Sequence, residues 1–107
     1  MRMFTYEMFE KRCKEIAKEI LKIKEIKYIV GIKRGGWVPA VRISHLTGLP
    51  IIEPDDFINT NDIAVIDEIL DSGRTREKYE EYKHFFVLVD KQKENILDWV
   101  EFFWEEK

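Results

Sequence analysis

Residues 63–76 read Ile-Ala-Val-Ile-Asp-Glu-Ile-Leu-Asp-Ser-Gly-Arg-Thr-Arg, and the rest of the chain is interpreted outward from this stretch. Its first four residues are apolar, a run too short for a helix of its own, and predict a buried strand of a parallel sheet. The acids Asp67 and Glu68 come directly after this run. They would therefore lie at the carboxyl end of the strand, where open α/β sheets bind their ligands.

Two more apolar residues lead from the acids to the turn at residues 71–75, Asp-Ser-Gly-Arg-Thr. This turn predicts the start of a helix that continues from Glu77 to Tyr82. Free amides and hydroxyls at the positive end of a helix favour a phosphate group. Acids for sugar hydroxyls or a metal, beside a phosphate site, indicate a ligand that is a phosphorylated sugar. The alternative is an ordinary strand-turn-helix in which Asp71 or Ser72 is only an N-cap.

A second turn of the same kind lies upstream. Residues 27–32 predict a buried strand, and Lys33-Arg34-Gly35-Gly36 follows it before a helix expected over residues 37–47. A basic Gly-Gly turn between a strand and a helix is a further candidate anion site. Gly-Gly turns are common, so this turn alone is weak evidence for an anion site.

The remaining pattern places these turns in a mainly parallel α/β fold. An amphipathic helix is expected over residues 5–23, with a buried stripe at helical spacing made of Met8, Phe9, Cys13, Ile16, Ala17, Ile20 and Leu21. Short strands are expected at residues 49–53 and 83–90. We expect strand 28–32 beside strand 63–67, with strand 50–53 outside the former and strand 84–89 outside the latter. The cleft then opens between 28–32 and 63–67, where the strand order reverses.

Composition limits the classes of function. A chain of 107 residues with a net charge of −3 predicts one globular domain, residues 1–107, and argues against a general nucleic-acid binder. The lone cysteine, Cys13, excludes an intrachain disulfide and favours a reducing compartment, so we expect a cytoplasmic protein. On the buried stripe it is expected to fill the core rather than to act as a nucleophile. No stretch is long enough for a membrane span, and the N-terminus has no signal-peptide pattern.

The apolar strand, acidic pair, two apolar residues and Asp-Ser-Gly-x-Thr turn resemble the signature of the type I phosphoribosyltransferases. In that family a strand followed by (Lys/Arg)-Gly-Gly and an apolar-Pro helix start binds pyrophosphate, and residues 33–40 match this pattern. The resemblance implies a compact Rossmann-like sheet of four to five strands with flanking helices. It also implies a non-proline cis peptide bond between Lys33 and Arg34.

The C-terminal segment is similar to that of the family members that act on 6-oxopurines. In those, a strand ending in lysine precedes Trp-(Val/Ile)-x-Phe-Pro-Trp-(Glu/Asp). The resemblance implies that Lys91 contacts the 6-oxo group, that Trp99 stacks on the base and that the backbone of Val100 reads the ring edge. Phe103 stands where the family often has proline. Taken alone, an aromatic tail is more often packing than a ligand shelf.

The resemblance also implies a reaction and its participants. Phosphoribosyl pyrophosphate would donate ribose 5-phosphate to the purine base, with Mg²⁺ as cofactor and a homodimer or higher homo-oligomer as the assembly. The resemblance implies that Asp67 and Glu68 hold the ribose hydroxyls and that Glu68 lies nearer the metal. The 5-phosphate would be bound by Ser72, Gly73, Arg74 and Thr75. The pyrophosphate would be bound by Lys33, Arg34, Gly35 and Gly36.

Two roles stay open at this stage. By the same resemblance, Asp71 would manage the proton of the base, with a plain N-cap as the alternative. Arg74 ranks below the other site residues, with a solvated residue at the helix start as its alternative. The connection at residues 54–62, where the family carries a long mobile hood, is short, and Asp55 and Asp56 within it are expected to be solvated. This departure leaves a non-catalytic sensor of phosphoribosyl pyrophosphate or nucleotide as the second hypothesis, and a pure interaction module as the third.

Overall fold

The computed structural model describes residues 2–53 and 59–105. The elements in this part of the chain follow one another in the order β1 (Arg2–Phe4), α1 (Tyr6–Lys22), β2 (Tyr28–Gly31), α2 (Trp37–Thr47), the 3-10 helix η1 (Thr60–Asp62), β3 (Ile63–Leu70), α3 (Arg74–Lys78), β4 (His84–Asp90) and β5 (Val100–Phe102). The predicted α/β class is confirmed. Asp55, Asp56 and most of the shortened hood connection lie outside the described residues.

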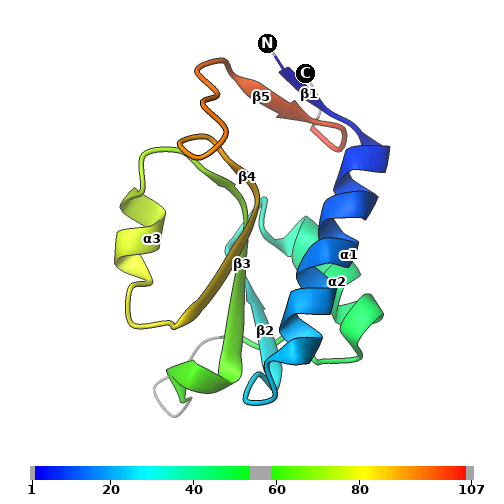
Figure 1. The fold of residues 1–107 in the computed structure, drawn as a ribbon, viewed down its shortest axis with the longest axis vertical. Coiled ribbons are helices and arrows are strands. Elements are labelled where there is room, and N and C mark those ends of the chain that lie inside the picture. The colour runs from blue at the N-terminus through cyan, green and yellow to red at the C-terminus, as the bar shows by residue number, and fades with distance from the viewer. Residues whose placement is uncertain (1, 54–58, 106–107) are drawn as a thin grey trace.

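The central sheet is parallel and has the strand order β2-β3-β4 (Figure 1). Ile51 forms an isolated parallel bridge with Ile29, so the 49–53 segment lies along the outer side of β2. The predicted order of neighbours is therefore confirmed, although this segment forms one bridge and not a strand. A second, two-stranded parallel sheet joins β1 to β5, which the sequence pattern did not predict.

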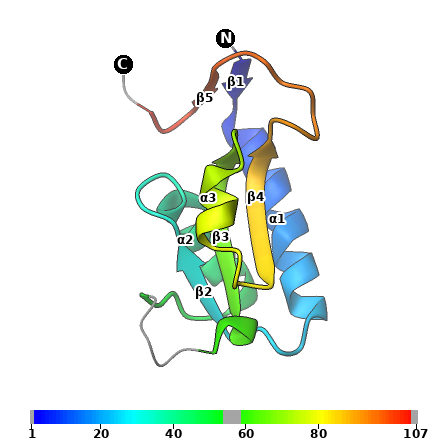
Figure 2. The same ribbon diagram turned by 90° about the vertical axis from the view of Figure 1, so that its left-hand side faces the viewer.

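Helices cover both faces of the central sheet. Figures 1 and 2 show α1 and α2 against one face and the short α3 against the other. Because side chains alternate along a strand, β3 contributes to both layers. Ala64 and Ile66 belong to the larger core beneath α1 and α2, and Ile63 and Val65 to a smaller one with Tyr82.

The N-terminal helix forms as its pattern predicts. Thr5 is the N-cap, its hydroxyl oxygen accepting a hydrogen bond from the Met8 amide over 3.2 Å. Five predicted stripe residues are buried, namely Phe9, Cys13, Ile16, Ala17 and Ile20. The prediction is wrong for Met8 and Leu21, which are 42% and 58% exposed. Met8 precedes buried Phe9 by one position, and Leu21 follows buried Ile20 by one position. One position turns a side chain by about 100° around the helix axis, so both side chains point toward solvent.

Cys13 fills the core, as expected. Its side chain is fully buried, and this burial raises the pKa of the thiol to about 12. A thiol that stays protonated is a poor nucleophile. The cysteine is therefore part of the packing between α1 and the sheet.

The helix after β3 is shorter than predicted. It covers only Arg74–Lys78, and the chain leaves helical geometry at Tyr79. The predicted continuation to Tyr82 is wrong because Tyr82 is drawn into the smaller core, where it packs with Val30, Ile63 and Val65. Among residues 2–53 and 59–105, no helix combines the length and apolar character required to cross a bilayer.

Candidate active site

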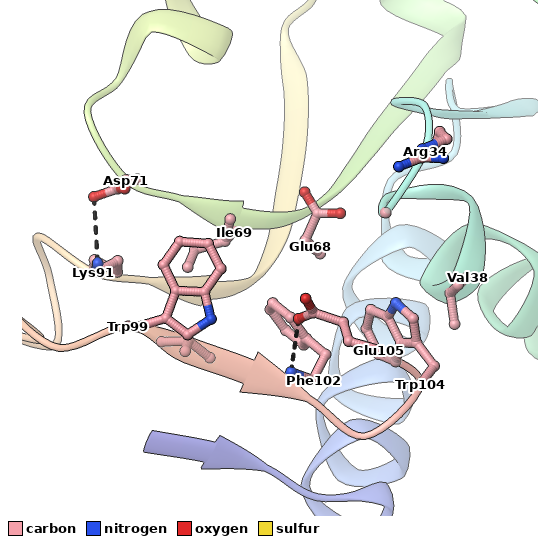
Figure 3. Close-up of a pocket in the computed structure, with 12 residues that line it drawn as sticks. Arg34, Val38, Glu68, Ile69, Asp71, Lys91, Trp99, Phe102, Trp104 and Glu105 are labelled. Atoms are coloured by element: carbon pink, nitrogen blue, oxygen red, sulfur yellow. Dashed lines mark hydrogen bonds and ion pairs between the residues drawn. The ribbon is translucent and has the colours of Figure 1, made fainter. Parts of the chain in front are cut away.

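The carboxyl ends of β2 and β3 lead into two loops that border one cavity of about 670 Å³. Twelve residues line it, and they come from these loops, from β3, from α2, from the end of β4 and from the C-terminal segment (Figure 3). They are Arg34, Gly35, Val38, Glu68, Ile69, Asp71, Lys91, Trp99, Val100, Phe102, Trp104 and Glu105. The volume is that of a typical small-molecule site.

The first loop, residues 33–36, is built around its glycines. The Lys33–Arg34 peptide bond is cis, as predicted. A Cβ atom on Gly36 would lie 2.6 Å from the backbone oxygens of both Ile32 and Ile66, so only glycine fits between β2 and β3. A Cβ atom on Gly35 would meet the Glu68 carboxylate, which therefore lies directly against this loop.

The acidic pair divides into a buried and an accessible member. Asp67 is 4% exposed, and its Oδ1 accepts a hydrogen bond from the Glu68 amide over 2.8 Å. Glu68 points into the cavity, between the Arg34 loop and Glu105 (Figure 3). Burial and the adjacent Asp67 carboxyl raise the pKa of Glu68 to about 8, with Glu105 contributing further, and burial also raises the pKa of Asp67.

The second loop is tied to the end of β4. The Lys91 ammonium lies 3.5 Å from Asp71 Oδ1, with 13% and 70% of the two side chains exposed. The Gln92 side-chain amide donates a hydrogen bond to the Asp71 carbonyl oxygen over 3.3 Å. An acid and a cation are thus held together at one end of the cavity.

The aromatic segment forms a wall of the same cavity. Trp99 is 68% exposed and lines the cavity together with Ile69 (Figure 3). The Arg2 amide of the N-terminal strand donates a hydrogen bond to the Trp99 carbonyl oxygen over 2.8 Å. Phe102 and Trp104 stack at 4.7 Å between ring centroids. The indole of Trp99 therefore offers an open flat face on a segment that β1 anchors.

The structure brings seven of the predicted site residues to the cavity lining and leaves seven outside it. Those that line it are Arg34, Gly35, Glu68, Asp71, Lys91, Trp99 and Val100. Those that do not are Lys33, Gly36, Asp67, Ser72, Gly73, Arg74 and Thr75. The last four continue directly from Asp71; within them Ser72 Oγ accepts a hydrogen bond from the Arg74 amide over 3.3 Å, and Gly73 has a φ of 88°.

Five lining residues were absent from the predicted set: Val38, Ile69, Phe102, Trp104 and Glu105. Glu105 is the most polar of them, and its Oε1 accepts a hydrogen bond from the Phe102 amide over 2.9 Å. The signal for Glu105 and Trp104 was present, since both complete the aromatic segment. Ile69 and Val38 look like ordinary core residues in the sequence. Their position at the cavity could not be predicted, because it depends on how the sheet and α2 pack.

Comparison with known proteins gives structural matches only. No protein-family model matches the chain, and neither does any curated protein. A purine phosphoribosyltransferase from Pyrococcus horikoshii Ot3 superposes with a TM-score of 0.73 at 21% identity, over 99% of this chain and 94% of the other. A Helicobacter pylori xanthine-guanine-hypoxanthine phosphoribosyltransferase gives 0.70 at 22%, over 96% and 90%.

A third solved structure is more distant. The HGPRT-ase from Leishmania tarentolae, in complex with GMP, superposes with a TM-score of 0.55 at 16% identity, over 90% of this chain and 72% of the other. At such identities the likeness concerns the path of the backbone. The chain has the fold of the purine phosphoribosyltransferases.

Proposed function

We propose that this protein transfers the 5-phosphoribosyl group of phosphoribosyl pyrophosphate to a 6-oxopurine base. One observation carries the proposal: a single cavity borders the basic Gly-Gly loop, Glu68 of the acidic pair, Asp71 and the Lys91–Trp99 segment. Each of these groups suits one part of the two substrates. The structural likeness to purine phosphoribosyltransferases supports the same class of reaction.

The sugar and its phosphates are assigned to the loops that follow β2 and β3. Arg34 and Gly35 line the cavity and would receive the pyrophosphate, with Lys33 and Gly36 in the same loop. The 5-phosphate would lie against the amides and hydroxyls of residues 72–75. Asp67 and Glu68 would hold the two ribose hydroxyls, since carboxylates are strong hydrogen-bond acceptors.

The base is assigned to the end of the cavity at Lys91 and Trp99, across from Arg34 (Figure 3). Trp99 provides a flat apolar surface for a purine ring, with Ile69 beside it. Lys91 carries only donors and so favours an oxo group over an amino group. The backbone of Val100, the first residue of β5, would read the ring edge.

Mg²⁺ suits this site as a partner of the substrate. Among residues 2–53 and 59–105, no three His, Cys, Asp or Glu side chains are arranged to hold a metal by themselves. Mg²⁺ in proteins commonly binds one or two carboxylates together with substrate phosphates. Glu68, with Glu105 also lining the cavity, provides such carboxylates. When bound, Mg²⁺ would neutralise charge on the departing pyrophosphate.

The reaction forms a bond from N9 of the purine to C1 of the ribose and breaks the C1–O bond to pyrophosphate. The purine loses one proton, which the carboxylate of Asp71 would accept. Positive charge builds on the ribose ring as the C1–O bond breaks. The acidic pair would stabilise this charge by proximity.

The direct test is incubation of the protein with phosphoribosyl pyrophosphate, Mg²⁺ and hypoxanthine, guanine or xanthine in turn. We expect a nucleoside monophosphate and pyrophosphate with at least one base, measured by chromatography. Tight binding of phosphoribosyl pyrophosphate without product would instead support a non-catalytic sensor. If the protein neither binds phosphoribosyl pyrophosphate nor forms product, both functions are contradicted and an interaction module remains.

A substitution tests the role of Asp71. Asp71→Asn should lower turnover by roughly 10²-fold or more, because the amide cannot accept the proton. Asp62→Asn is the matched control, since Asp62 precedes β3 at the other end of the strand. The N-cap of α3 is Gly73, so the alternative in which Asp71 caps this helix is wrong. Wild-type turnover in Asp71→Asn would remove the proton-transfer role and leave Asp71 only as the ion-pair partner of Lys91.

A further inference from the structure

Lys33, in the basic loop at residues 33–36, forms an ion pair that the proposed function does not explain. Arg34 and Gly35 line the cavity, and Lys33 does not. Its ammonium instead lies 3.4 Å from Oε1 of Glu53. The acid is part of the segment beside β2, where the Ile52 amide donates a hydrogen bond to the Ile29 carbonyl oxygen over 2.9 Å. The sheet edge therefore supplies a carboxylate to the loop that leaves β2.

The charges of this pair matter for an anionic ligand. A pyrophosphate group carries several negative charges, and any approach to Lys33 brings it toward Glu53 as well. The ligand must displace the carboxylate from the ammonium, and the displaced carboxylate then repels it. Arg34, one residue further on, is paired with no acid among the described residues.

We propose that Glu53 is an internal counter-ion that competes with the pyrophosphate group for Lys33. It thereby weakens binding of phosphoribosyl pyrophosphate and eases release of the product pyrophosphate. Glu53 is a positioning residue in this scheme, because it acts through Lys33 and touches no reacting atom. The inference rests on the proposed function, since it needs an anion in the loop at residues 33–36.

Solvent exposure sets the size of the effect. The side chains of Lys33 and Glu53 are 65% and 61% exposed, so their pairing contributes little to the stability of the fold. Removing the carboxylate should leave the protein folded. Its influence on a ligand of high charge is larger than on the fold, yet salt screens it over about 8–10 Å. The expected signature is thus a change in anion affinity that fades as ionic strength rises.

The experiment is calorimetric titration of inorganic pyrophosphate with Mg²⁺ at low and high salt. Glu53→Gln should bind pyrophosphate about threefold more tightly than the wild type at low salt, with the difference shrinking at high salt. Glu19→Gln is the matched control, because it removes the same charge from an exposed position of α1. It should bind as the wild type does.

Two further measurements separate the mechanism from general charge effects. In a Lys33→Gln background, Glu53→Gln should no longer tighten binding. In steady-state kinetics, Glu53→Gln should lower KM for phosphoribosyl pyrophosphate and leave KM for the purine unchanged, a split that a merely structural role would not produce. Thermal denaturation checks that each variant is folded.

The outcomes distinguish the inference from the function beneath it. If the wild type binds pyrophosphate and Glu53→Gln binds it equally well, the counter-ion role is overturned while the proposed function stands. The same holds if the gain persists in the Lys33→Gln background. If neither protein binds pyrophosphate, the proposed function fails and the inference falls with it.

Discussion

Glu68 is the residue whose surroundings change its chemistry most. Its carboxyl lies against Gly35, beside buried Asp67 and across the cavity from Glu105. Burial and these neighbouring acids raise its pKa from 4.5 to about 8. In the unliganded protein the acidic pair therefore holds a proton near neutral pH. An arriving cation or ribose would meet a site whose charge depends on pH.

The raised pKa of Glu68 makes the free energy of unfolding depend on pH. Because the folded pKa lies above the unfolded value, the folded state binds more protons than the unfolded state between those two values. The free energy of unfolding should therefore fall as pH rises from about 5 to about 8. Burial raises the pKa of Asp67 as well, which acts in the same direction.

Thermal denaturation of the unliganded protein across that range measures the effect. Glu68→Gln should lose most of the pH dependence and should be more stable than the wild type at the alkaline end. Glu19→Gln, an exposed carboxyl on α1, should keep the wild-type slope. Identical slopes in the wild type and Glu68→Gln would show that the acidic pair titrates normally.

Trp99 is argued to bind the base rather than to support the fold. Its side chain is 68% exposed, so Trp99→Ala should leave the melting temperature nearly unchanged. Loss of base stacking costs roughly 1–3 kcal/mol in comparable sites, so KM for the purine should rise about tenfold. KM for phosphoribosyl pyrophosphate should change much less. Leu97→Ala is the control, since Leu97 lies in the same loop and is 97% exposed.

An equal rise of both KM values in Trp99→Ala would mean that the indole only shapes the segment. A substantial fall in melting temperature would point to packing as well. Either result would favour the alternative interpretation, in which the aromatic tail is only packing. The hydrogen bond from Arg2 to the Trp99 carbonyl would remain, because it uses only backbone atoms.

At the scale of elements, the two glycines in the loop at residues 33–36 have different surroundings. The three atoms nearest to a Cβ atom on Gly35 would all belong to the flexible Glu68 side chain, whereas those nearest to one on Gly36 would be backbone atoms of Ile32 and Ile66. Gly35→Ala should therefore fold normally and lose activity because Glu68 is displaced. Gly36→Ala should lose about 1–3 kcal/mol of stability because β2 and β3 must shift.

Chemical denaturation and the phosphoribosyl-transfer assay together measure this contrast. The two substitutions add the same methyl group at adjacent positions, so each serves as the control for the other. Equal losses of stability would contradict the distinction. Full activity in Gly35→Ala would show that the contact between Glu68 and the loop is not required.

Elements with a local signal could be predicted from the sequence. The 63–76 stretch and the Gly-Gly loop are contiguous patterns, so the strand, the acidic pair and the turn were predicted in the right order. The predicted strand was too short, because β3 continues through Asp67 and Glu68 to Leu70 and still pairs with β4 there. The helix after Gly73 was overestimated because Tyr82 packs into a core that no local pattern reveals. The pairing of β1 with β5 could not be predicted, because the two strands are far apart in sequence and neither segment alone has a pattern that indicates its partner.

The candidate site was predictable to the same extent. Lys91, Trp99 and Asp71 were identified through a family pattern, and all three line the cavity. Glu105 was not assigned a role although it completes the aromatic segment, because the sequence alone does not show where its carboxylate lies. Its place opposite Glu68 depends on the folding of the C-terminal segment across the carboxyl edge of the sheet.

At the scale of the whole molecule, three segments distant in sequence build one cavity. The loop after β2 and the loop after β3 meet because their strands are adjacent and parallel. The C-terminal segment joins them because β5 pairs with β1, and Phe4 contacts Phe102 edge-on at 5.3 Å. The two loops to which the anionic groups are assigned follow strands of the central sheet, and the wall to which the base is assigned belongs to the two-stranded sheet. Both substrates would therefore meet at the junction of the two sheets.

A crystal structure with a bound purine nucleoside monophosphate tests this arrangement most directly. We expect the base against Trp99, its 6-oxo group at the Lys91 ammonium, the ribose hydroxyls at Asp67 and Glu68, and the 5-phosphate on the amides of residues 72–75. A nucleotide bound outside the cavity would contradict the account. So would one in the cavity with its phosphate at Lys91 and its base away from Trp99.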